Sequence, residues 1–326
     1  MKDKVITEIQ NKMARLLNHS QLDELGKVIN AALTGVELVV KAENELPNNE
    51  LLNVFLSAKR IEGCSEKSIK YYQSTIKLMI ERVVQPIRSI TTDHLRGYLS
   101  EYQKKRGSSK VTIDNMRRIF SSFFGWLEDE DYILKSPVRR IHKIKTDKPI
   151  KETFSDESLE LLRDACTEIR DLTMIDLLAS TGMRVGELVG LNREDINFHE
   201  RECVVLGKGG SERVVYFDAR TKIHLLNYLE NRRDGSSALF VTLSLPHERL
   251  QIGGVETRLR EIGKRVNMNK VHPHKFRRTL ATRAIDKGMP IEQVQHLLGH
   301  VKIDTTMHYA MVNQANVKNS HRKYIG

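Results

Sequence analysis

The chain has 326 residues, which is enough for two domains of ordinary size and a short additional segment. Forty per cent of the residues are apolar, and no stretch approaches the roughly 18 consecutive apolar residues that a membrane span needs. Three cysteines lie far apart without a CxxC pair, which argues against a disulfide framework or a structural zinc site. We therefore expect a soluble cytoplasmic protein.

The net charge of +11 is distributed unevenly along the chain. Residues 1–47 carry six basic and seven acidic residues, whereas residues 48–150 carry 20 and 12. The remaining 27 basic and 23 acidic residues fall in 151–326. An excess of lysine and arginine favours polyanions, because binding releases condensed counterions. The pattern suits a DNA-clamping module beside a second, less basic module.

Residues 1–47 predict a helical N-terminal extension, because apolar residues recur at helical spacing until Pro47. Residues 48–143 predict a separate domain of four helices, with Ser65 and Thr92 as candidate N-caps. The expected helices span 50–60, 66–84, 92–105 and 110–128. An apolar cluster at the end of the fourth helix predicts core packing rather than base stacking: Phe120, Phe123, Phe124, Trp126 and Leu127.

A basic stretch without clear periodicity follows between Pro137 and Pro149. We predict that residues 144–152 form an interdomain linker. Its charges either remain solvated or contact DNA phosphates at the hinge of a clamp, and both interpretations stay open. The candidate DNA contacts are Arg139, Arg140, Lys143 and Lys145.

Residues 153–326 predict a mainly helical domain with a small β insert. Two valine-rich runs, 202–206 and 213–217, flank a glycine-rich segment, which is typical of a β-hairpin. The expected helices span 156–169, 172–180, 219–232, 255–266, 275–287 and 291–298. The whole chain is thus predicted to be mainly α with a small antiparallel β insert.

Four short strings in this last segment could carry chemistry: Thr181–Leu188, Gly207–Gly209, His274–Arg277, and Leu298–His300 followed nine residues later by Tyr309. Singly, each residue in them is more often structural. Their joint order and spacing make them candidates for one site.

Cutting a phosphodiester without a metal needs a nucleophile, cations that neutralise the non-bridging oxygens, and an acid for the leaving oxygen. Arginine suits the second task because its planar fork binds phosphate through two hydrogen bonds. Lysine on a hairpin tip can reach the leaving oxygen. A tyrosine nucleophile would conserve the bond energy in a covalent intermediate, so the strand could be rejoined without ATP.

The four strings resemble the catalytic boxes of the tyrosine recombinase (phage integrase) family. The resemblance covers 150–310 and extends upstream, where Phe123–Leu127 followed by Ser136-Pro137 looks like the end of the family's core-binding domain. It implies a helical, SAM-like core-binding domain followed by a tyrosine recombinase catalytic domain. The catalytic residues it implies are Arg184, Lys208, His274, Arg277, His300 and the nucleophile Tyr309.

Three further residues qualify this match. Arg278 stands where many members have histidine, which affects local packing alone. His308 precedes Tyr309, but consecutive helical residues point about 100° apart, so a role as base is disfavoured. Glu187 lies three residues after Arg184 and is either an orienting carboxylate for that arginine or a simple surface acid.

The resemblance implies site-specific recombination of duplex DNA through a 3′-phosphotyrosine and a Holliday junction, with four protomers on two sites. It also implies that no metal or cofactor is needed. An accessory DNA-bending protein is a further candidate partner. In the family, the segment after the nucleophile packs on a neighbouring protomer, and Met311–Tyr324 is long enough to do so. The acidic, helical start argues against an arm-binding domain and favours a Xer-type or small mobile-element enzyme. Two alternatives remain: relaxation of DNA like a type IB topoisomerase, or a catalytically inactive DNA-binding regulator.

Overall fold

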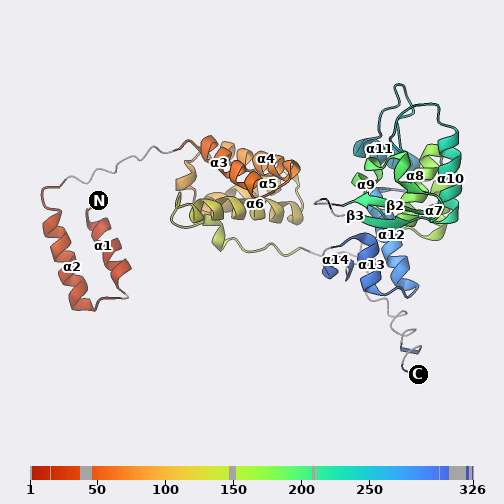
Figure 1. The fold of residues 1–326 in the computed structure, drawn as a ribbon. Coiled ribbons are helices and arrows are strands. Elements are labelled where there is room, and N and C mark those ends of the chain that lie inside the picture. Colours follow the sequence, from red (N-terminus) through yellow and green to blue (C-terminus); the bar gives the residue numbers. More distant parts are fainter. Residues whose placement is uncertain are drawn as a thin grey trace. The chain divides into compact units, whose positions relative to one another are not determined.

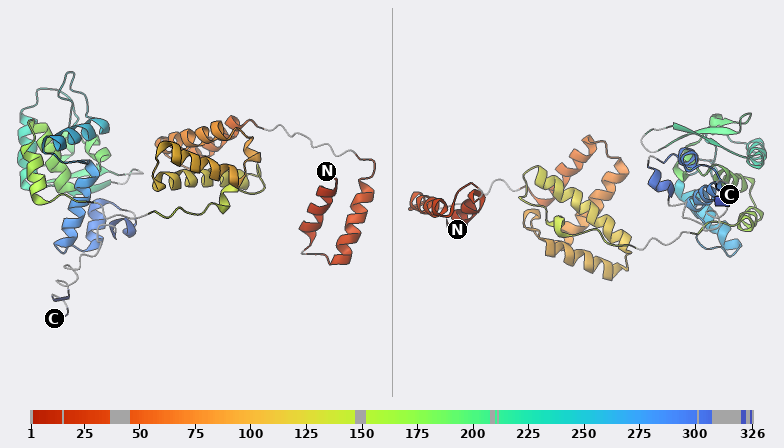
Figure 2. Two further views of the ribbon diagram at one scale, coloured as in Figure 1. Left: turned by 180° about the vertical axis from the view of Figure 1, so that it is seen from behind. Right: turned by 90° about the horizontal axis from the view of Figure 1, so that it is seen from below.

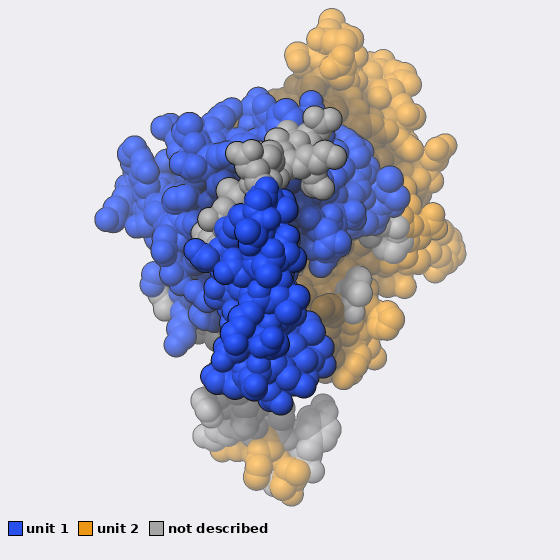
Figure 3. All heavy atoms as spheres, turned by 90° about the vertical axis from the view of Figure 1, so that its left-hand side faces the viewer, with its two compact units in different colours: residues 1–148 blue, residues 149–326 orange. Residues whose placement is uncertain are grey.

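The computed structural model describes residues 2–14, 16–36, 46–146, 152–207, 210, 212–300, 302–307, 321–322 and 325. The chain divides into two compact units, residues 1–148 and 149–326 (Figure 3). Both are mainly helical, and the named strands of the described residues form a single antiparallel sheet (Figure 1). The predicted fold class is therefore confirmed. Among the helices in the described ranges, none is long and apolar enough to cross a membrane.

The first unit begins with a helical hairpin. Its helices α1 (Lys2–Met13) and α2 (His19–Ala32) lie side by side (Figures 1 and 2). A capping box starts α2, because Asn18 and Gln21 each accept a hydrogen bond from the backbone N–H of the other at 3.0 Å. None of the described residues of this hairpin is fully buried, so the two helices enclose no core of their own.

Four helices of the first unit surround an aromatic core: α3 (Asn48–Ile61), α4 (Glu66–Val83), α5 (Thr92–Arg106) and α6 (Lys110–Asp129). The ring of Phe55 lies edge-on to Phe123 at 5.1 Å and 5.6 Å from Trp126. Such aromatic pairs add to the stability that area burial alone provides. All five members of the apolar cluster predicted in α6 are buried, so the prediction of core packing is confirmed.

The helix starts predicted at residues 66 and 92 are confirmed, whereas of the two predicted N-caps Ser65 is right and Thr92 is off by one residue. Ser65 caps α4 by accepting a hydrogen bond from the N–H of Ser68. The cap of α5 is Thr91, not Thr92, because the Thr91 hydroxyl accepts from the N–H of His94. The Thr92 hydroxyl instead donates to the carbonyl of Pro137 at 2.7 Å, a contact across 45 residues that the local sequence does not reveal.

The beginning of the basic stretch lies against this first unit. A short 3-10 helix spans Pro137–Arg140, and its Val138 is buried in the core. The N–H of Ile144 donates to Asp114 Oδ1 at 3.1 Å, and Arg139 pairs with Glu128 at 2.9 Å. Residues 137–144 are therefore ordered by contacts within the unit.

The second unit is built around α8 (Ile169–Thr181), whose Met174, Ile175, Leu177 and Leu178 are fully buried. The helix packs against α10 (Ala219–Glu230) and α12 (Pro273–Asp286). The other elements are α7 (Asp156–Asp164), α9 (Val185–Gly190), β1 (Ile196–Asn197), β2 (Glu202–Leu206), β3 (Glu212–Tyr216), α11 (Ile252–Arg265), α13 (Ile291–Leu298) and α14 (Ile303–Met307). The sheet order is β1-β2-β3, with Val205 opposite Arg213, so the predicted hairpin is confirmed.

The predicted helix over 156–169 is wrong in its C-terminal part, because α7 ends at Asp164 and α8 begins at Ile169. Arg265 of α11 donates to the carbonyl of Ala165 at 3.0 Å and to the Thr167 hydroxyl at 3.4 Å. These contacts stabilise a non-helical connection, and they come from a residue about 100 positions away. Helical periodicity within the segment could not predict them.

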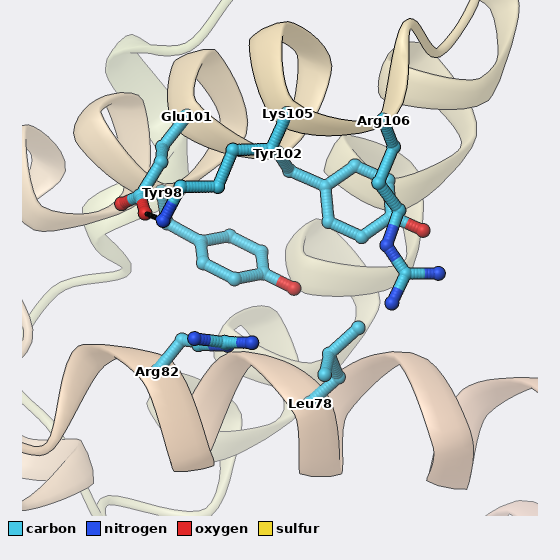
Figure 4. A pocket seen from close by; sticks show the side chains of 7 residues that line it. All are labelled: Leu78, Arg82, Tyr98, Glu101, Tyr102, Lys105 and Arg106. Atoms are coloured by element: carbon cyan, nitrogen blue, oxygen red, sulfur yellow. Dashed lines mark ion pairs between the residues drawn. The ribbon is translucent and has the colours of Figure 1, made fainter.

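Tyr98 of α5 places a polar atom inside the first unit. Its side chain packs against Phe120, and its hydroxyl is buried without a hydrogen-bond partner among the described residues. Burial, followed by the neighbouring Tyr102, raises the pKa of Tyr98 to about 12. Figure 4 shows the ring in a hollow between α4 and α5 that is lined by Leu78, Arg82, Glu101, Tyr102, Lys105 and Arg106.

We expect Tyr98→Phe to change the free energy of unfolding by less than about 1 kcal/mol, because the substitution keeps the ring and breaks no protein hydrogen bond. Denaturant unfolding of the full chain measures this change. Leu95→Ala on the same helix is the control and should cost about 2–5 kcal/mol, because Leu95 is fully buried. A loss above about 2 kcal/mol in Tyr98→Phe would contradict this description of the hydroxyl.

Candidate active site

The string Thr181–Leu188 forms the turn from α8 into α9. Gly182 ends α8 with a φ of +61°, and a Cβ there would lie 2.6 Å from Leu280 Cδ2. The position therefore requires glycine both for its backbone conformation and for its close packing. Arg184 follows as the N-terminal cap residue of α9, with its side chain 34% exposed. A guanidinium that is partly open to solvent can still reach a ligand.

Two arginines converge on the string Leu298–His300. Arg277 of α12 is 2% exposed and donates to the carbonyls of Gly182, at 2.8 Å, and Leu298. Arg184 donates to the carbonyl of Gly299 at 3.1 Å. Three strings that lie far apart in the sequence thus meet in one place, and they bring two guanidinium groups to the same short turn.

His300 lies between Arg277 and the helix that precedes Tyr309. Its Nε2 lies 2.9 Å from Arg277 Nη2, and its Nδ1 lies 2.9 Å from the hydroxyl of the fully buried Thr306 in α14. A guanidinium can only donate, so Nε2 accepts and Nδ1 carries the proton. Burial, then Arg277, Arg184 and Arg213, lower the pKa of His300 to about 4. The imidazole is therefore uncharged at neutral pH.

The structure gives less detail for the other residues that the sequence predicts at the site. His274 lies on α12 one turn before Arg277, on the same helical face, and its side chain is exposed. Arg278 donates to the carbonyl of Glu152 at 2.8 Å. Lys208 and Tyr309 lie outside the described residues, as does His308; Lys208 falls between β2 and β3, and Tyr309 falls two residues after α14.

Glu187 joins Arg184 to an arginine that the motif analysis missed. Its Oε1 lies 2.9 Å from Arg184 Nη1 and 2.7 Å from Arg213 Nη1, and its Oε2 lies 2.7 Å from Arg213 Nη2. Burial raises the pKa of Glu187, but the hydrogen bonds from Arg213 and Arg184 outweigh it and hold the pKa below its ordinary value. Of the two interpretations of Glu187, the geometry favours the orienting carboxylate over the surface acid.

Arg213 does carry a sequence signal. It shares a face of β3 with Val215, which is fully buried, so the alternation of the strand directs a charged side chain inward. Inward-facing charges need partners. In the part of the chain that the structure describes, no group of three or more His, Cys, Asp or Glu residues could hold a metal ion. The side chains at the site are mostly cationic, which suits an anionic ligand.

Comparison with known proteins identifies the family. The phage integrase family model matches residues 152–316, and the phage integrase N-terminal SAM-like domain model matches 51–134. The tyrosine recombinase XerC of Staphylococcus aureus strain JH9 is 31% identical in a 285-residue alignment, and the match covers 83% of this chain and 94% of that protein. The chain belongs to the phage integrase family of tyrosine recombinases.

Solved structures support the same fold at lower identity. The Tn1549 transposon integrase in complex with a circular intermediate DNA aligns with a TM-score of 0.70 and 17% identity, covering 84% of this chain and 98% of that one. A lambda integrase dimer bound to a core site aligns with a TM-score of 0.69 and 20% identity, covering 90% and 87%. The predicted family is thus confirmed, and the protein is a DNA-binding enzyme that breaks and rejoins DNA.

The uncharged state of His300 predicts a pH dependence of stability. Because folding lowers its pKa from 6.5 to about 4, the folded state binds this proton less readily than the unfolded state. The contribution of the uncharged His300 imidazole to the free energy of unfolding is fully present above pH 6.5 and is lost as the pH falls from 6.5 towards 4. Denaturant unfolding at several pH values should therefore show a steeper acid loss for the wild type than for His300→Gln.

His199→Gln is the control for this experiment, because the His199 side chain is 93% exposed. The same substitution at this surface position tests whether the loss of any histidine changes the acid slope. Equal acid slopes for the wild type and His300→Gln would show that His300 is not held uncharged by the fold.

Proposed function

We propose that this recombinase acts at specific sites through a 3′-phosphotyrosine on Tyr309. In this proposal, the Tyr309 oxygen attacks the scissile phosphorus and gives up its proton to solvent, and the 5′ oxygen leaves as a hydroxyl, protonated by Lys208. The freed 5′-hydroxyl then attacks the phosphotyrosine of a partner duplex, which releases the tyrosine and forms a Holliday junction. A second round of the same steps resolves the junction.

The convergence of Arg184, Arg277 and His300 on the Leu298–His300 turn carries the proposal. A pentavalent phosphate accumulates charge on its non-bridging oxygens, and fixed guanidinium groups stabilise that charge without reorganisation. His300 is uncharged and both of its ring nitrogens are hydrogen-bonded, so it would hold Arg277 and α14 in place rather than bind the phosphate oxygens itself. His274, one turn from Arg277, would provide a further hydrogen bond to the same oxygens.

The contacts of Thr306 support Tyr309 as the nucleophile. The hydrogen bond between Thr306 and His300 fixes α14 to the turn that the arginines bind, and Tyr309 follows three residues after Thr306. Tyr309 would thereby lie within a few residues of a contact with the turn that the arginines bind. The match to a protein named as a tyrosine recombinase favours this chemistry over simple relaxation of DNA or an inactive regulator.

We further propose duplex DNA as the substrate and four protomers on two sites as the active assembly. A lambda integrase tetramer bound to a Holliday junction has the same fold, with a TM-score of 0.67 at 20% identity. Arg139, Arg140, Lys143 and Lys145 would contact phosphates. The Arg139 side chain is 62% exposed while it pairs with Glu128, so a DNA phosphate could replace the Glu128 carboxylate.

A nicked suicide substrate tests the nucleophile. When cleavage releases a short 5′ fragment that diffuses away, the covalent protein–DNA adduct accumulates and resists denaturing electrophoresis. We expect the wild type to form the adduct and Tyr309→Phe to form none, because phenylalanine has no hydroxyl. The control is Tyr71→Phe, which changes a half-exposed tyrosine of the first unit and should retain the adduct. An adduct formed by Tyr309→Phe would refute the assignment.

A further inference from the structure

We propose that Arg213 is a positioning residue for DNA cleavage, which holds the β2–β3 hairpin against Glu187 and the end of α13 so that Lys208 and Arg184 act on the same phosphate. The inference rests on the proposed function, because Arg213 touches neither DNA nor Tyr309 in this scheme. It assigns a task to an arginine that lies beside Arg184 and Glu187 but outside the catalytic motifs.

One guanidinium connects three elements of the second unit. Arg213 of β3 forms a bidentate pair with Glu187 of α9, at 2.7 Å for both bonds, and its Nε donates to the carbonyl of Leu297 in α13 at 3.2 Å. The Arg213 side chain is 12% exposed and that of Glu187 is 3% exposed. A buried bidentate pair is strongly directional, and removal of one partner leaves an unpaired buried charge.

The turn at Gly299 is shaped to admit this side chain. Gly299 ends α13 with a φ of +63°, and a Cβ at this position would lie 2.8 Å from Arg213 Cδ. The turn that accepts hydrogen bonds from Arg184 and Arg277 therefore packs directly on the stem of Arg213. A shift of Arg213 would be transmitted to the backbone next to His300.

The sheet gives the hairpin little support of its own near its turn. β1 pairs with β2 only at Glu202 and Cys203, so at Val205 the described strands leave β2 with β3 as its sole partner. A two-stranded hairpin is marginally stable without side-chain packing. Arg213 lies opposite Val205 and five residues after Lys208, so it fixes β3 close to where the turn begins.

Charge balance gives Arg213 a second effect at the same carboxylate. Glu187 shares Oε1 between Arg184 and Arg213. With Arg213 present, the two guanidinium groups of Arg184 and Arg213 face one carboxylate, and these three side chains together keep a net positive charge for the phosphate. Without Arg213, Glu187 would pair with Arg184 alone and neutralise it.

The experiment measures single-turnover cleavage by the full chain on two suicide substrates, one with the natural 5′ oxygen and one with sulfur at the bridging position. A thiolate leaves without protonation, because thiols are far more acidic than alcohols. We expect Arg213→Met to cleave the oxygen substrate about 100-fold more slowly than the wild type, as a misplaced acid would. On the sulfur substrate, the rate deficit of Arg213→Met relative to the wild type should be at least about ten-fold smaller.

Arg213→Lys keeps the charge but not the bidentate geometry, and should fall between the wild type and Arg213→Met. Arg232→Met is the matched control, because Arg232 is a buried arginine of the same unit, 4% exposed and paired with Asp234. Its substitution should affect both substrates equally.

Two results would overturn the inference: oxygen-substrate cleavage by Arg213→Met within about three-fold of the wild type, or an equal loss on both substrates. Lys208→Ala, measured in parallel, separates these failures from that of the proposed function. If the sulfur substrate restores the cleavage rate of Lys208→Ala but not that of Arg213→Met, Lys208 remains the acid and only the positioning role of Arg213 is overturned. Equal losses of Lys208→Ala on both substrates contradict Lys208 as the acid, and the inference falls with it.

Discussion

The carboxylate of Glu187, shared by Arg184 and Arg213, is the interaction on which the geometry of the site depends. An isolated carboxylate at this depth would lose its hydration without compensation, and its pKa would rise. Two guanidinium groups and the backbone N–H of Arg184 compensate for that loss, so the acid stays ionised. The buried charge therefore holds α9, β3 and the end of α13 in one arrangement, since any separation would expose an unpaired ion.

Hydrogen bonds to main-chain carbonyls extend this arrangement to the rest of the site. Arg184 and Arg277 bind the carbonyls of Gly299 and Leu298, and Arg277 also binds that of Gly182. These bonds fix the rotamers of both arginines in a site that would otherwise hold flexible, mutually repelling cations. Main-chain carbonyls of the site thus hold the two arginines in place. The free energy needed to bring these like charges together is supplied when the chain folds, so no rearrangement is needed during the reaction.

The sequence predicted the members of the site better than their connections. Arg184, Arg277 and His300 follow from the order of short motifs, and the Gly182 and Gly299 turns belong to those motifs. Arg213 does not, because its partners Glu187 and Leu297 lie 26 and 84 residues away and no local pattern joins them. The same limit explains the break between α7 and α8, where hydrogen bonds from the distant Arg265 stabilise a non-helical connection. Lys208 and Tyr309 remain predictions, as both lie outside the described residues.

The central claim is that Tyr309 becomes joined to DNA, and locating the bond on the protein tests it most directly. The adduct trapped on a suicide substrate would be digested with nuclease and trypsin, and its modified peptide identified by mass spectrometry. Cleavage after Lys302 and Lys318 yields the peptide 303–318, which contains Tyr309 as its one tyrosine. The account predicts a nucleotide on this peptide, with fragment ions that place it at Tyr309. A nucleotide at His308, or on any other peptide, would contradict the account.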